Sequence, residues 1–288
     1  MKNFLKRELT QYVMESAANW LPEINDRFYD EPVIQYASAT DPLFAEYKKI
    51  IGEDHLTPQE AFEKSCGKNS FQGGTVISMV LPINAKIRES NRPQKEWPSQ
   101  EWVLLRTFGD DAFLTGLLRH WEDLLNQSGH QTVAPGIAAW FKTYGTDAGP
   151  SSVWSERHAA YAAGLGTFSI NDGFITEQGI AVRLLSVITA LQLAPDSRKA
   201  KTHTGNCLFC SKGVCGACIR RCPVGAISEK GHDKVKCLHY VYGEESRAYA
   251  VARGGSAKFA SGCGLCQTNV PCECRNPMGV DLQSNWTA

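Results

Sequence analysis

Cysteine spacing constrains this chain more than any other feature of its sequence. Ten of its eleven cysteines lie in one stretch near the C-terminus, several of them in pairs three residues apart. The ten cysteines are Cys207, Cys210, Cys215, Cys218, Cys222, Cys237, Cys263, Cys266, Cys272 and Cys274. Cysteines at such short spacing can direct two thiolates at one metal centre, so the stretch predicts a metal-binding region.

The run ends in a cysteine followed by proline, Cys222-Pro223, as does the run of bacterial ferredoxins, in which the fourth cysteine serves the other cluster. We therefore predict two [4Fe–4S] clusters in a crossed pattern. The predicted ligands of the first cluster are Cys210, Cys215, Cys218 and Cys272. Those of the second are Cys222, Cys237, Cys263 and Cys266.

This assignment leaves Cys207 and Cys274 over. Spacing does not decide between Cys272 and Cys274, and we favour Cys272 because it follows a proline and lies closer to the paired motif. The pattern departs from the ferredoxin run in one respect, because four residues rather than two separate Cys210 from Cys215.

Three other uses of these cysteines remain open. Disulfides suit small secreted domains, and no secretory segment is recognisable at the N-terminus. A structural zinc site needs two Cys-x-x-Cys pairs, but the pairs here are far apart and cysteines are in surplus. The third possibility is a single cluster with spare cysteines.

Length and charge set further limits. A chain of 288 residues can bury a large core in one domain or two. Thirty basic residues balance thirty acidic ones, so the sequence lacks the basic character of a dedicated nucleic-acid binder. No apolar run approaches the length of a membrane span. Reduced thiolates then favour the cytoplasm of an organism that lives at least partly without oxygen, with no membrane partner.

Hydrophobic periodicity predicts an α+β fold with two domains, residues 1–200 and the cysteine-rich residues 201–288. The predicted helices are residues 3–21, a helix capped by Asp110 or Asp111 and stopped by Gly129, and a short helix from Ser155 to Gly164. The predicted buried strands are residues 75–82 and 180–193.

Three local features predict binding sites in the first domain. Residues 140–154 mix aromatic residues, a carboxylate, glycine and proline without a period, as ligand-carrying loops do. Gly164 and Gly166 indicate a tight turn that allows close backbone approach. Arg183 interrupts an apolar strand, so it either pairs with a carboxylate or meets an anionic ligand.

Several of these motifs together resemble the epoxyqueuosine reductase family, which is related to the corrinoid reductive dehalogenases. The resemblance spans roughly residues 70–277. It rests on Glu156-Arg157 with Ala163-Gly164-Leu165-Gly166, the strand beginning near Gly179, Cys222-Pro223-Val224-Gly225-Ala226-Ile227, Cys237 and Cys263-x-x-Cys266.

The resemblance implies an α+β domain that holds cobalamin, joined to a ferredoxin-like domain with two clusters in the crossed arrangement. It also implies a proton donor, for which Asp147 is our first candidate and Tyr144 our second. The family's aspartate lies in an Asp-x-Ala-Pro stretch just before Glu-Arg. Asp147-Ala148-Gly149-Pro150 is the only similar piece here, and it lies several residues too far from Glu156.

Two further departures lead us to expect a compact relative. The family's C-terminal helical-repeat region, which helps to hold tRNA, has no counterpart after Cys274, and no Asp-x-His-x-x-Gly motif provides a lower axial histidine. The leading hypothesis is a cobalamin-dependent iron–sulfur reductase of a small or nucleoside-like substrate. The alternative is an electron-transfer protein without its own substrate, and a tRNA-acting enzyme is a third interpretation.

An electron donor is implied in either of the first two cases. Arg220, Arg221 and the basic residues from Arg198 to Lys201 are candidates for docking an acidic donor such as ferredoxin or flavodoxin.

Overall fold

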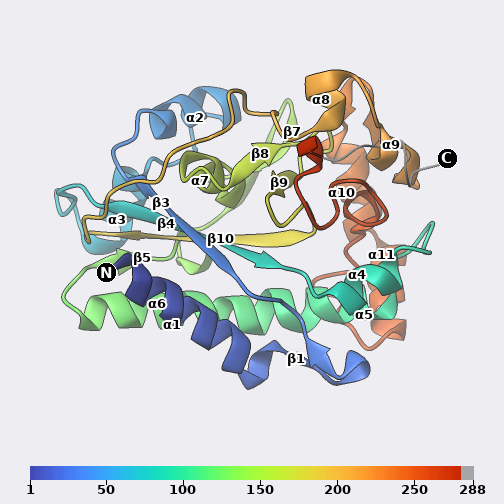
Figure 1. Ribbon diagram of the computed structural model, residues 1–288, viewed down its shortest axis with the longest axis horizontal. Helices are drawn as coiled ribbons and strands as arrows, with labels where there is room; N and C mark the ends of the chain where they lie inside the picture. Colours follow the sequence, from blue (N-terminus) through green and yellow to red (C-terminus); the bar gives the residue numbers. More distant parts are fainter. Residues whose placement is uncertain (280–288) are drawn as a thin grey trace.

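The fold is built on a four-stranded antiparallel sheet with strand order β3-β4-β10-β5 (Figure 1). The computed structural model describes residues 1–279. The strands are β3 (Val33–Ser38), β4 (Thr75–Pro82), β10 (Val182–Thr189) and β5 (Thr132–Val133). β4 and β10 pair over their whole length, from Thr75 opposite Thr189 to Pro82 opposite Val182.

Both faces of the sheet are buried, and the two central strands alternate between them. In β4, Ile77, Met79 and Leu81 face one hydrophobic cluster, which includes Leu5, Leu9 and Val13 of the first helix. Val76 and Val80 face a second cluster on the other side. This is the period-two pattern of a strand covered on both sides, and it explains why strands 4 and 10 read as nearly continuous apolar runs.

Helices cover both faces, and Figure 1 shows α1 and α6 below the sheet with α2 and α7 above it. The helices of the first half are α1 (Lys2–Glu15), α2 (Leu43–Ile51), α3 (Pro58–Cys66), α4 (Ala85–Asn91), α5 (Gln100–Leu104), α6 (Leu114–Gln127) and α7 (Glu156–Ala162). Those of the cysteine-rich half are α8 (Leu208–Lys212), α9 (Ala217–Arg221), α10 (Lys234–Tyr242) and α11 (Glu244–Ala252).

Short two-stranded ribbons and 3-10 turns complete the fold of the described residues. The two-stranded ribbons pair β1 (Trp20–Leu21) with β2 (Asp26–Arg27), β6 (Thr143–Thr146) with β7 (Gly149–Ser152), β8 (Gly166–Phe168) with β9 (Phe174–Thr176), and β11 (Ile227–Ser228) with β12 (Gly231–His232). Single 3-10 turns are η1 (Ala17–Asn19), η2 (Pro22–Ile24), η4 (Pro135–Ile137), η5 (Leu265–Gln267) and η6 (Pro277–Gly279).

The main strand predictions are confirmed. β4 has the predicted bounds of 75–82, and β10 occupies the centre of the predicted strand 180–193. The predicted first helix is shorter than expected, because Ser16 has extended backbone angles and ends it at Glu15. The short helix after Ser155 is also present, and Gly164 follows it with a positive φ of 83°.

The prediction that Asp110 or Asp111 caps a helix is wrong. Residues 100–127 form one continuous helical segment, in which the π-helix η3 (Leu105–Phe113) joins α5 to α6. Asp110 lies inside this segment and is buried. Its carboxylate accepts bonds from Arg106 at 2.7 Å and Arg183 at 2.8 Å. Burial alone would raise the pKa of Asp110, but the two arginines outweigh burial and lower it.

The prediction of an irregular loop over residues 140–154 is also wrong. Thr143–Thr146 and Gly149–Ser152 pair as an antiparallel hairpin, with Thr143 opposite Ser152 and Thr146 opposite Gly149. Gly149 has a φ of 101°, which favours glycine and allows the tight turn. Asp147 and Ala148 form the turn, and the glycine and proline that suggested a loop begin the second strand of a β-ribbon.

Side chains of the first half pack closely on the cysteine-rich half. Trp102 of α5 lies against Gly264, where an added Cβ would come within 2.0 Å of the indole ring. Arg106 lies against Gly262 in the same way, at 2.6 Å. Glu273 accepts ionic bonds from Arg88 at 3.1 Å and Arg92 at 2.8 Å. Across residues 1–279, no helix combines the length and apolar character needed to cross a membrane.

We expect Asp110→Asn to destabilise the fold by about 3–5 kcal/mol, because it removes the only anion of a buried ionic group and leaves two arginines facing each other. Urea unfolding followed by circular dichroism measures the change. Asp111→Asn is the matched control: its side chain is 46% exposed, so the free energy of unfolding should change by less than about 0.5 kcal/mol. Equal effects of the two substitutions would contradict this account of Asp110.

Candidate functional site

Four thiols line one small cavity of about 20 Å³ in the cysteine-rich half. Its cysteines are Cys207, Cys215, Cys218 and Cys272, which we call the first thiol set. The burial of Cys218, together with the neighbouring thiols of Cys207 and Cys215, raises the pKa of Cys218 to about 12. Uncompensated thiols held this close together are poised to share a cation that would stabilise their thiolate forms.

Cys207 belongs to this set, whereas the sequence prediction named Cys210 in its place. Cys210 is exposed and does not line the cavity, although its thiol is hydrogen-bonded to that of Cys207. Cys207 precedes that helix and is buried, with the Ser169 hydroxyl 3.8 Å from its sulfur. Burial works to raise the pKa of Cys207, but backbone N–H groups of Cys210 and Ile170 and the Ser169 hydroxyl outweigh it and lower the pKa.

The second thiol set is the one that the spacing predicted. Burial and the neighbouring Cys237 and Cys222 thiols raise the pKa of Cys263 to about 12. The pKa of Cys266 is raised well above its usual value, first by burial and then by the other three thiols of the set and Cys218. The two sets are therefore adjacent, and α9 connects them, since it carries Cys218 and is followed by Cys222.

The thiols of neither set come together around a single metal-ion position. In residues 1–279, no three His, Cys, Asp or Glu side chains come close enough together to hold a single metal ion. The first set instead lines a small space, which is the donor arrangement that a four-iron cluster uses. The second set provides the same number of thiol donors close together. Cys274 is exposed and lies outside the lining of the first cavity.

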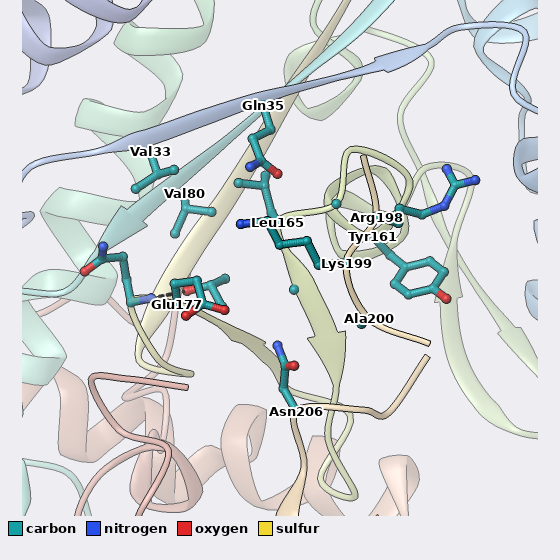
Figure 2. Close-up of a pocket in the computed structure, with 14 residues that line it drawn as sticks. Val33, Gln35, Val80, Tyr161, Leu165, Glu177, Arg198, Lys199, Ala200 and Asn206 are labelled. Atoms are coloured by element: carbon teal, nitrogen blue, oxygen red, sulfur yellow. Dashed lines mark hydrogen bonds between the residues drawn. The ribbon is translucent and has the colours of Figure 1, made fainter. Parts of the chain in front are cut away.

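A second cavity lies beside the first thiol set, between the sheet and the chain that follows β10 (Figure 2). Residues 194–203, which we call the strap, run without regular structure along the sheet toward α8 and close this space (Figure 1). The strap cavity measures about 90 Å³. Its lining residues include Val33, Gln35, Val80, Tyr161, Gly164, Leu165, Gly166, Arg198, Lys199 and Asn206.

One polar atom in the wall of the strap cavity has no hydrogen-bond partner among the described residues. The side-chain oxygen of Gln35 is buried and has no hydrogen-bond partner among the described residues. Asn206 lines the cavity and directly precedes Cys207, so the cavity adjoins the first thiol set. A buried acceptor without a partner costs free energy, which a bound donor group would recover.

The strap is held in place by ionic bonds. Asp196 accepts from Lys2 at 2.8 Å and from the Tyr36 backbone at 3.0 Å. Arg198 donates to Asp41 at 2.6 Å. Gly164 permits the close approach, because a Cβ there would come within 2.8 Å of the Ser197 carbonyl oxygen.

The glycines predicted to bind a cofactor lie on the wall of the strap cavity, but the backbone that approaches them is the chain's own. Gly164 meets Ser197, and a Cβ on Gly166 would come within 2.2 Å of the Ile175 carbonyl oxygen. Arg183 has the carboxylate partner that was one of its two predicted possibilities, Asp110, and is not in the cavity lining.

The two candidate proton donors lie together on the β6–β7 hairpin. Asp147 is exposed at its turn. The Tyr144 hydroxyl is buried without a hydrogen-bond partner in the described part of the chain, and it would contact a Cβ on Gly52 at 3.2 Å. Burial raises the pKa of Tyr144. Neither residue lines the strap cavity.

Sequence reasoning missed a buried acid between α7 and the sheet. Glu156, at the start of α7, accepts a hydrogen bond of 2.5 Å from the Ser186 hydroxyl, which itself accepts one from the Trp154 indole at 2.9 Å. Burial raises the pKa of Glu156 to about 8 against these hydrogen bonds, which lower it. The signal was a serine inside the apolar strand β10, which indicates a polar partner on the facing helix.

We expect Glu156 to make the fold less stable as the pH rises. Its folded pKa lies above the unfolded value of about 4.3, so the folded chain keeps a proton that the unfolded chain loses. The stability is therefore complete below about pH 4 and is lost as the pH rises toward 8. Between pH 5 and pH 8, Glu156→Gln should gain on the order of 2–4 kcal/mol relative to wild type in urea unfolding. The exposed Glu23→Gln should run parallel to wild type, and parallel profiles for Glu156→Gln would contradict the assignment.

Comparisons with known proteins support the fold. No family model and no curated protein matches the sequence. A selenomethionine-labelled epoxyqueuosine reductase is structurally similar, with a TM-score of 0.52, 18% identity, and coverage of 94% of this chain and 66% of that chain. An epoxyqueuosine reductase bound to an epoxyqueuosine-modified tRNA-Tyr stem loop gives a TM-score of 0.50 and 20% identity, with the same coverage.

The catabolic reductive dehalogenase NpRdhA matches 71% of this chain and 26% of its own, at a TM-score of 0.45 and 18% identity. The chain thus spans just under two thirds of the length of the first two proteins. The resemblance to epoxyqueuosine reductases that the motifs predicted is confirmed at the level of the fold.

Proposed function

We propose that this protein is an iron–sulfur oxidoreductase with two [4Fe–4S] clusters. The observation that carries the proposal is the division of eight thiols into two adjacent sets of four, one of which adjoins the strap cavity. The first cluster would be held by Cys207, Cys215, Cys218 and Cys272, with Cys207 replacing the Cys210 of the sequence prediction. The second would be held by Cys222, Cys237, Cys263 and Cys266.

The two clusters would form a single electron path. The second thiol set includes Cys237 on α10, and the first adjoins the strap cavity through Asn206. Electrons would enter at the second cluster, pass to the first, and reach an acceptor bound in the strap cavity. The fold likeness to reductases supports this direction, and the substrate class we propose is a small or nucleoside-like molecule.

A corrinoid is the acceptor cofactor that the fold likeness suggests, and a bound one would supply a reducible cobalt centre. The strap cavity as folded does not accommodate it. At about 90 Å³ it lies well below the range of about 300–1,000 Å³ usual for drug-sized ligands, which are themselves smaller than a complete cobalamin. Binding of a corrinoid would require the strap to leave its ionic contacts with Lys2, Tyr36 and Asp41.

The alternative function is an electron-transfer protein that delivers electrons to a partner enzyme. The small size of the strap cavity favours this alternative over a corrinoid enzyme. Proton donation by Asp147 or Tyr144 belongs to the reductase proposal alone, and it would require the substrate to reach the β6–β7 hairpin.

The cluster assignment predicts that two neighbouring cysteines differ sharply. After anaerobic purification, wild type should hold about eight irons per chain, and Cys207→Ser about four. Cys210→Ser should keep about eight, because its thiol lies outside the first cavity. Iron and sulfide analysis with electron paramagnetic resonance measures this. Loss of iron in Cys210→Ser with retention in Cys207→Ser would restore the sequence assignment, and zinc in place of iron in wild type would disprove the proposed function.

The corrinoid question is tested at the strap. If the strap must open, Asp196→Asn should bind cobalamin with an association rate at least several-fold higher than wild type, because the ionic bond to Lys2 is lost. Stopped-flow absorbance measures the rate. Glu53→Gln, an exposed carboxylate elsewhere, serves as the control. Full iron content with no cobalt uptake by either protein would favour the electron-transfer alternative.

A further inference from the structure

A histidine that the cluster assignment does not use lies directly before the helix that carries Cys237. His232 ends β12, and Asp233 caps α10 by accepting a hydrogen bond of 2.9 Å from the Lys236 N–H. Relative to this cap, His232 is the preceding residue and Cys237 is the fourth residue of the helix. Side chains at these two positions often pack against each other at the start of a helix, which directs the imidazole toward the Cys237 thiol.

The ribbon formed by β11 and β12 holds the backbone of His232 beside the second thiol set. The Ala226 N–H donates to the Cys222 sulfur at 3.1 Å, and the Ala226 carbonyl accepts from the Asp233 N–H at 2.7 Å. The ribbon therefore joins Cys222 to the cap of the helix that carries Cys237. His232 lies on this connection between two thiols of the same set.

A carboxylate fixes one side of the His232 ring. The Oδ2 atom of Asp172 lies 3.2 Å from Nδ1 of His232, whose side chain is 14% exposed. An ionised carboxylate can only accept, so Nδ1 carries a hydrogen and donates it to Asp172. Nε2 is the other polar atom of the ring, and the second side-chain hydrogen bond of His232 is to Cys237.

Asp172 is positioned in turn by the first half of the chain. It lies in the turn between β8 and β9 with a φ of 56°, and its N–H donates to the Ser169 carbonyl at 2.9 Å. Arg157 of α7 donates to the Asp172 carbonyl at 2.5 Å. The same turn contacts the first thiol set, because the Ser169 hydroxyl donates to the Cys207 sulfur at 3.8 Å. A carboxylate held in this way orients an imidazole, as carboxylates next to metal sites commonly do.

An imidazole that donates to a ligand sulfur changes the reduction energetics of the cluster that the sulfur binds. Reduction adds one negative charge to the cluster and its thiolates. A hydrogen bond to the sulfur stabilises the more negative form, so it raises the reduction potential. His232 lies between two acceptors, a carboxylate and a thiolate, and it can donate to both only as the imidazolium. Its positive charge therefore acts in the same direction as its hydrogen bond.

We propose that His232, oriented by Asp172, raises the reduction potential of the second cluster through its hydrogen bond to the Cys237 sulfur. This proposal rests on the proposed function in one respect, that Cys237 is a ligand of that cluster. It adds a residue that adjusts the cluster without binding it, and it implies that the second cluster accepts electrons from a weaker reductant than the cysteines alone would allow.

The test is a redox titration followed by electron paramagnetic resonance, on proteins purified anaerobically with their clusters. His232→Leu should lower the equilibrium constant for reduction of one cluster about tenfold, which is about 59 mV for one electron, and should move the other cluster less than half as far. His232→Gln should recover at least half of the shift, because its amide N–H can replace Nε2–H as the donor. His239→Leu removes an exposed histidine from the same helix and should titrate as wild type does.

Iron analysis separates the possible failures. Iron-free wild type would mean that the proposed function itself is wrong. With about eight irons per chain, equal potentials in wild type and His232→Leu would overturn the proposal. Equal shifts in His232→Leu and His232→Gln would overturn it too, because the ring would then act by packing alone. If His232→Leu loses iron, Asp172→Asn decides: it keeps the ring and should lower the same potential, and an unchanged potential would contradict the role of His232.

Discussion

A buried carboxylate between two arginines from distant parts of the chain is the interaction on which the arrangement of the two halves depends. Asp110 holds Arg183 of the central strand β10 and Arg106 of the π-helix. Arg106 in turn lies on Gly262, next to Cys263, and donates to Tyr242 of α10. Because an unpaired buried charge is costly, each partner fixes the position of the other, and the sheet is registered against the second thiol set.

Glycines, which have no side chain, allow the two halves to pack closely against each other. Gly264 admits Trp102 between two cysteines of the second set, and Gly179 admits the backbone of Glu273 and Cys274, where a Cβ would come within 2.4 Å. Such close backbone approach leaves little room for sliding, because any side chain at these positions would displace an element. The domain boundary predicted near residue 200 therefore falls in a chain whose two halves share extensive close packing.

The local sequence pattern was enough to predict the elements that depend on local sequence. The apolar runs gave β4 and β10, the glycine after α7 gave its end, and regular cysteine spacing gave the second thiol set. It failed where tertiary contacts decide. Asp110 was interpreted as a cap because aspartate is a good cap, and only the folded chain shows the arginines that hold it inside a π-helix. Cys210 was preferred over Cys207 on spacing; in the fold Cys207 lines the first cavity beside Ser169, which is distant in sequence, and the exposed Cys210 lies next to Cys207 outside that lining.

The strap is joined covalently to the loop that carries Cys207. The residues that close the cavity lead within a few positions to Cys207, and the His203 carbonyl at the end of the strap accepts from Phe168 of β8 at 2.7 Å. A molecule that displaces the strap therefore moves the loop that carries one thiol of the first set. With the proposed cluster bound by that set, occupancy of the cavity and the reduction potential of the cluster would be linked thermodynamically. By reciprocity, any gain in the electron affinity of the cluster when the cavity fills would equal the gain in the ligand affinity of the cavity when the cluster is reduced.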